Sequence, residues 1–74
     1  MIQKVFLTFP QRLIDEPIVY ELGRRFHVRT NIRGASITPE VALVALTMDG
    51  EPADVAAAIA HLEALGVHVE RLAD

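Results

Sequence analysis

The run Val41–Met48 constrains the fold most strongly, because every residue in it except Thr47 is apolar. In a β-strand, successive side chains point to opposite faces, so this run presents apolar side chains on both faces. A sheet with one layer of helices covers only one of those faces. We therefore expect a strand in this run and some other cover for its second face.

Two further strands frame this run. The segment Gln3–Phe9 has the composition of a strand, and Pro10 ends it because proline withholds a backbone donor. Its side chains divide into two faces, which are Val5, Leu7 and Phe9 on one side and Lys4, Phe6 and Thr8 on the other. Between Val28 and Ile37 the apolar positions switch parity, which a regular strand cannot do, so the sequence predicts a bulge at Gly34.

Two helices are predicted from apolar spacing and end signals. The first runs from Pro17 to about Phe26, with Asp15 as its cap, Asp15 and Glu16 at the positive end of its dipole, and an apolar stripe of Ile18, Leu22 and Phe26. The second runs from Pro52 to Leu65 and ends at Gly66, with Val55, Ile59 and Leu62 facing inward. A short strand of Val67, Val69 and Leu72 completes the chain.

The order β-α-β-β-α-β predicts an α+β fold, the ferredoxin-like βαββαβ sandwich. In that fold a four-stranded antiparallel sheet carries two helices on one face. Phe6 and the outward half of the run at 41–48 then leave apolar side chains on the open face. Because a domain of 74 residues buries only about 60% of its unfolded surface, we expect a homodimer through this face.

Composition excludes several classes of function. With 7 Lys+Arg against 10 Asp+Glu, the formal net charge is -3, which argues against nucleic acid as a partner. The absence of cysteine excludes disulfides, iron–sulfur ligation and thiol nucleophiles. No segment has the apolar length of a signal peptide or a membrane span, so we expect a cytoplasmic protein that does not insert into membranes.

No catalytic constellation is visible, and we expect no enzyme, no cofactor and no metal. The histidines His27, His61 and His68 lack metal-ligand spacing, and we expect His61 on the outer face of its helix. Nucleophile elbows, phosphate-binding loops and dinucleotide fingerprints are absent. Asp15 and Glu16 are adjacent carboxylates, but a role at the helix start accounts for them.

The arginines are unevenly distributed. Arg24, Arg25, Arg29 and Arg33 lie close together in the sequence, around the end of the first helix and the second strand. They could complement the helix dipole and solubilise the surface. Alternatively, a guanidinium from this segment could bind a carboxylate or another anion.

Several segments resemble the NIL domain family over nearly the whole chain. They are Phe6–Pro10, Glu16–Leu22, Arg25–Val28, Asn31–Arg33, Ala58–Leu62 and Gly66–Glu70. The resemblance implies one NIL-like domain over residues 1–74, with a fold similar to the ligand-sensing ACT domain. Members of this family occur at the C-terminus of methionine-import ABC transporter ATPases, on ferredoxin-type proteins linked to sulfur amino-acid metabolism, and as small free-standing proteins.

The resemblance also implies a ligand site. In the transporter branch, domains pair through their sheets and bind methionine near the pairing surface, with help from an asparagine that matches Asn31. The candidate ligand-binding residues are therefore Asn31, Ile32 and Arg33, where Arg33 replaces the family's usual aliphatic residue. The expected function is non-catalytic sensing of methionine or a related amino acid at a dimer interface. The alternative is an interaction or accessory module for a transporter or a sulfur amino-acid enzyme, without a free ligand.

Overall fold

The computed structural model describes residues 1–73. Along the chain, three strands and the two helices come before a short final strand, and a turn of 3-10 helix follows the first strand. The elements are β1 (Ile2–Pro10), η1 (Gln11–Leu13), α1 (Ile18–Phe26), β2 (Arg29–Ile37), β3 (Val41–Asp49), α2 (Pro52–Leu65) and β4 (His68–Leu72).

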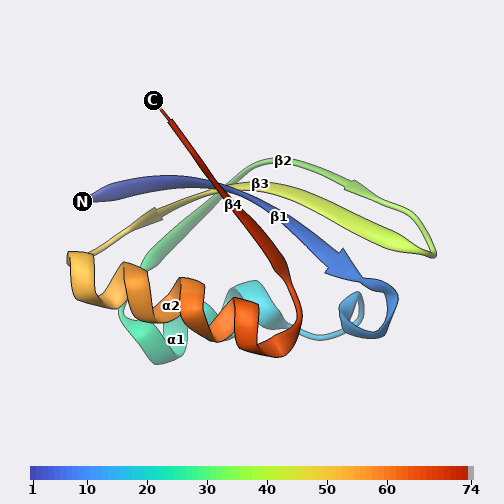
Figure 1. Cartoon of the computed structure of the whole chain (residues 1–74), viewed down its shortest axis with the longest axis horizontal. Helices are drawn as coiled ribbons and strands as arrows, with labels where there is room; N and C mark the ends of the chain where they lie inside the picture. Colours follow the sequence, from blue (N-terminus) through green and yellow to red (C-terminus); the bar gives the residue numbers. More distant parts are fainter. Residues whose placement is uncertain (74) are drawn as a thin grey trace.

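The four strands form one antiparallel sheet in the order β2-β3-β1-β4. Both helices lie on the same side of this sheet, and no layer formed by residues 1–73 covers the other side (Figure 1). The predicted ferredoxin-like α+β sandwich is confirmed. The turn η1 was not predicted, and it places Leu13 in the core beneath the helices.

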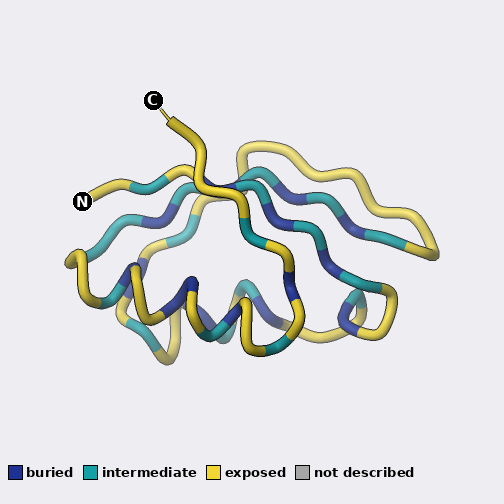
Figure 2. The backbone as a smooth tube through the Cα atoms, viewed as in Figure 1, coloured by how far each residue is buried: buried dark blue, intermediate teal, exposed yellow. Residues whose placement is uncertain are grey.

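The core lies between the sheet and the two helices. In β3, buried and half-buried residues alternate along the whole strand, and β1 follows the same pattern from Val5 onward (Figure 2). The buried set faces the helices and includes Val5, Leu7, Val44, Leu46 and Met48, together with Leu22, Val55, Ile59 and Leu62 from α1 and α2. No polar or charged side chain of residues 1–73 is buried. The inward stripes predicted for α1 and α2 pack on the core, where all their residues are buried except Phe26, which is half-buried.

The predicted bulge in β2 is confirmed. Ile32 pairs with Leu46 of β3, but Gly34 pairs with Ala45, so Arg33 is an extra residue in the ladder. Because the bulge reverses the alternation, Ala35 and Ile37 turn to the helix side, the same side as Ile32. The parity switch in the sequence thus keeps the apolar residues of β2 on one face.

The start of α1 differs from the prediction. We expected Asp15 to cap this helix, but the N-cap position is Pro17, and no side chain caps it. The Ile18 N–H instead donates to the Glu16 carbonyl at 2.8 Å, so a backbone turn satisfies that donor. The Asp15 carboxylate is exposed and has no capping role.

The end of α2 agrees with the prediction. Gly66 adopts a left-handed conformation with φ 105°, which a residue with a side chain adopts at a cost. The Val67 N–H donates to the Leu62 carbonyl at 3.0 Å, and the Arg12 guanidinium donates to the Leu65 carbonyl at 2.6 Å. Arg12 thereby ties η1 to the C-terminus of α2.

Candidate functional site

The open face of the sheet is apolar at its centre. Paired residues of neighbouring strands point to the same face of the sheet. At the centre of the open face, Phe6 pairs with Ala45, and Thr8 pairs with Leu43. These four side chains are half-buried although no layer of residues 1–73 covers them. Such a surface is typical of an interaction or ligand site.

One end of the open face is hollowed. This sheet hollow has a volume of about 460 Å³, and its lining includes Ile2, Lys4, Arg33, Ala45, Thr47 and Leu72. Ile2 is 63% exposed and Leu72 is 37% exposed, so two large apolar side chains border the hollow in contact with solvent. Two cationic side chains, Lys4 and Arg33, accompany them, so the hollow combines apolar surface with positive charge.

The bulge contributes directly to this hollow. Arg33 is the extra residue of β2, and its side chain lines the hollow next to residues of β1 and β3. Asn31 pairs with Thr47, which also lines the hollow, so Asn31 shares the open face with Arg33. Both side chains are exposed. The strand therefore carries an amide and a guanidinium on the same side.

Ile32 occupies the opposite face. Its ladder partner Leu46 is buried beneath the helices, so the Ile32 side chain points to the helix side, where it is 58% exposed. Of the three predicted ligand residues, Asn31 and Arg33 share the open face, and Arg33 lines the sheet hollow. Any contribution of Ile32 to a site on the open face comes through the backbone of β2.

The arginines do not form one cluster. Arg24 lies on α1 and pairs with Glu21 at 3.6 Å, and Arg25 lies over the Phe26 ring with its guanidinium carbon 5.7 Å from the ring centroid. Arg29 and Arg33 lie on β2, and Arg29 pairs with Asp49 in the ladder. The four arginines are close in the sequence, but in the structure two lie on α1 in the helix layer and two lie on β2 in the sheet.

The histidines show one correction. His68 is exposed, whereas His61, which we expected on the outer face of α2, is half-buried. Its ring centroid is 5.0 Å from that of Phe26, so it faces α1. His27 is exposed and has a positive φ of 54° at the end of α1. Among residues 1–73, no group of three or more His, Asp or Glu side chains is placed to hold a metal ion.

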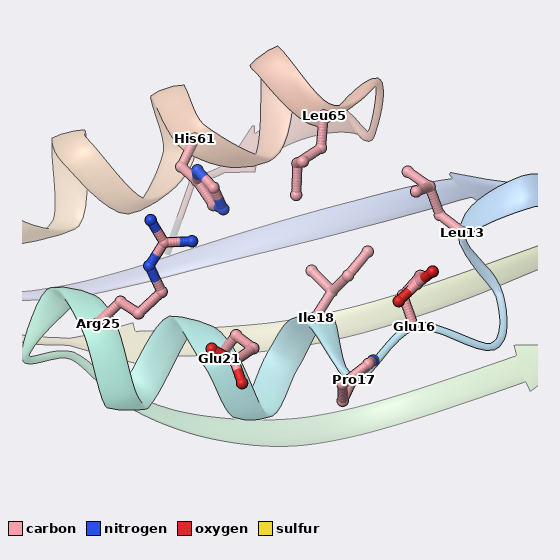
Figure 3. A pocket seen from close by; sticks show the side chains of 8 residues that line it. All are labelled: Leu13, Glu16, Pro17, Ile18, Glu21, Arg25, His61 and Leu65. Atoms are coloured by element: carbon pink, nitrogen blue, oxygen red, sulfur yellow. The ribbon is translucent and has the colours of Figure 1, made fainter.

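Sequence reasoning missed a second depression, which lies between the two helices. Its lining includes Ile18, Glu21 and Arg25 of α1 and His61 and Leu65 of α2 (Figure 3). The available signal was the spacing of His61 and Leu65, because residues four apart share one face of a helix. Within residues 1–73, no helix is both long enough and apolar enough to cross a membrane.

The fold and the open sheet face define a small ferredoxin-like α+β domain with one uncovered apolar surface. The sequence matches the NIL domain family over residues 3–71, so the chain belongs to this family. The resemblance noted in the sequence is thereby confirmed.

Known proteins agree with this assignment. The chain is 37% identical over 70 residues to the methionine import ATP-binding protein MetN of Sodalis glossinidius (strain morsitans), covering 89% of this chain and 20% of that protein. It therefore spans about a fifth of the length of that relative.

Solved structures confirm the fold. The C-terminal domain of an ABC transporter ATP-binding protein from Enterococcus faecalis superposes with a TM-score of 0.85 at 22% identity, covering 97% of this chain and 84% of that one. A de novo designed protein, Foldit4, superposes with a TM-score of 0.60 at 7% identity, covering 99% of this chain and 96% of the design. Because a designed protein shares the fold, the fold alone assigns no function.

Proposed function

We propose that residues 1–74 form a single non-catalytic regulatory domain that binds methionine or a related amino acid on its open sheet face, at an interface between two copies. The observation that carries the proposal is that Asn31 and Arg33 share that face: Arg33 lines the sheet hollow, and Asn31 pairs in the ladder with Thr47, which also lines it. The name of the relative, a methionine import ATP-binding protein, suggests the ligand class and a transporter as the regulated partner.

The chemistry of the face suits an amino acid. The Arg33 guanidinium presents donors in a fork that matches a carboxylate, and the Asn31 amide both donates and accepts. Ile2 and Leu72 offer apolar surface to a thioether or an aliphatic side chain. The volume of about 460 Å³ falls within the usual range of small-molecule sites.

A second copy supplies what the isolated domain lacks. The sheet hollow is open to solvent, as the exposure of Ile2 and Leu72 shows, and a ligand there is covered on one side only. Pairing two open faces buries the outward side chains of β1 and β3 and encloses the ligand between the sheets. Ligand binding and pairing then stabilise each other, because a ligand that binds only the pair shifts the equilibrium towards it.

Calorimetry with a panel of amino acids tests the ligand. We expect methionine or a related amino acid to release or absorb heat with the wild-type protein, and Asn31→Ala to weaken binding about tenfold, because one hydrogen-bonding partner is lost. Ser36→Ala is the matched control, since Ser36 pairs with Leu43 and shares the strand and face of Asn31. The absence of heat from every amino acid contradicts the ligand proposal.

Light scattering during gel filtration tests the interface. We expect the mass of two copies, and an increase in the paired fraction when methionine is added. A single-copy mass at every concentration, with and without methionine, contradicts pairing. A partner protein that co-purifies with the chain, together with no thermal shift from any amino acid, identifies an interaction module and replaces the sensing role.

A further inference from the structure

A second depression lies on the layer opposite the open face. The helix groove is the depression between α1 and α2, with a volume of about 460 Å³ (Figure 3). Leu13, Ile18 and Leu65 provide apolar surface along it. The groove therefore has the size and apolar surface that small-molecule sites share.

The helix groove has cationic side chains at one end and a carboxylate at the other, and Glu21, which pairs with Arg24, lines it between Ile18 and Arg25 (Figure 3). Arg25 and His61 lie at one end, where their side chains point toward one another across the gap between the helices (Figure 3). Glu16 lies at the other end, beside Leu13 and Pro17. Because α1 rises about 1.5 Å per residue, Pro17 and Arg25 are separated by about 12 Å along the helix.

The Arg25 guanidinium has no carboxylate partner among residues 1–73. It lies over the Phe26 ring, and that ring contacts His61. Glu21, which is the nearest acidic residue in the sequence, pairs with Arg24. The donors of Arg25 are therefore available to a carboxylate, which a guanidinium binds through two parallel hydrogen bonds. His61 adds one ring N–H donor in its neutral form and two when it is protonated.

We infer that the helix groove binds a short apolar peptide with free termini, with its carboxylate at Arg25 and His61 and its ammonium at Glu16. This inference is independent of the proposed amino-acid site, which lies across the sheet. A single amino acid carries both charges on one carbon and cannot reach both ends of the groove. An extended tripeptide spans about 10 Å, which is close to the separation of the charged ends.

Titration with trileucine tests the site, with nuclear magnetic resonance of the backbone amides as the readout. We expect the amides of Ile18 and Leu65 to shift, and Arg25→Gln to weaken binding about tenfold, because a charge-assisted hydrogen-bonded pair is lost. Glu16→Gln should weaken trileucine binding to the same extent, because the peptide's ammonium group loses its carboxylate partner. Both residues are exposed, so the variants keep the fold, which their thermal unfolding checks.

Modified peptides assign each end. Trileucine amide lacks the carboxylate, so Arg25→Gln should not weaken its binding further, and acetylated trileucine should be insensitive to Glu16→Gln in the same way. Arg29→Gln is the matched control, because it removes the same charge from an exposed arginine on β2 that does not line the groove. Asn31→Ala should leave binding unchanged, which separates this site from the open face.

Three results overturn the inference. They are no shift of the groove amides with trileucine, binding that Arg25→Gln leaves unchanged, and leucine binding as tightly as trileucine.

Discussion

The two faces of the sheet carry the same alternation of side chains but differ in what covers them. On the helix side, residues such as Leu46 and Met48 are fully buried by α1 and α2. On the open side, Phe6, Leu43 and Ala45 are apolar and are covered only by their neighbours in the sheet. The chain therefore encodes two apolar surfaces and supplies a cover for one, so the second surface is available for function.

A matched pair of substitutions in β3 gives the largest expected difference between the faces. Leu46→Ala should lower the free energy of unfolding by about 2–5 kcal/mol, because it leaves a cavity under the helices. Leu43→Ala removes the same atoms from the open face and should cost about 1 kcal/mol in a single copy. Chemical denaturation measures both values at a protein concentration at which light scattering gives the mass of a single copy. Equal losses contradict the difference in cover between the two faces.

Much of this difference was predictable from the sequence. Three features depend only on the spacing of apolar residues along a strand, which can be read from the sequence. They are the two-sided apolar run at 41–48, the alternation in β1 and the parity switch at Gly34. Pro52 and Gly66 mark the ends of α2 for the same reason, since their backbone preferences act locally.

Features that depend on tertiary position were not predictable. The start of α1 is set by a backbone turn at Glu16, so the carboxylate of Asp15 was not needed as a cap. His61 faces α1 because the two helices lie side by side, and the sequence does not give their separation. The family resemblance named Asn31 and Arg33, but only the ladder shows that Arg33 is the extra residue of the bulge and lines the sheet hollow.

A charge placed on the open face sharpens the comparison. If a second copy covers this face, the unfolding midpoint of the wild-type protein rises with protein concentration, because association stabilises the folded state. Phe6→Asp should abolish this dependence, since pairing would bury a carboxylate, and should cost about 1 kcal/mol in a single copy.

Ala56→Asp is the control for this experiment. It adds the same charge at an exposed position of α2, so it should keep the concentration dependence. A wild-type midpoint that does not change with concentration contradicts pairing through the open face.

The smallest expected effect tests how far the cover of the helix side extends. Ile37 points to that side, but it lies near the end of β2 and is 66% exposed. Ile37→Thr should therefore change the free energy of unfolding by about 0.5 kcal/mol or less. Val44→Thr, on the same side in β3, should cost about 1–2 kcal/mol, because Val44 is buried and a hydroxyl there loses its water. Thermal and chemical unfolding of the two variants measure the boundary, and a loss at Ile37 as large as that at Val44 would mean that the cover reaches the edge strand.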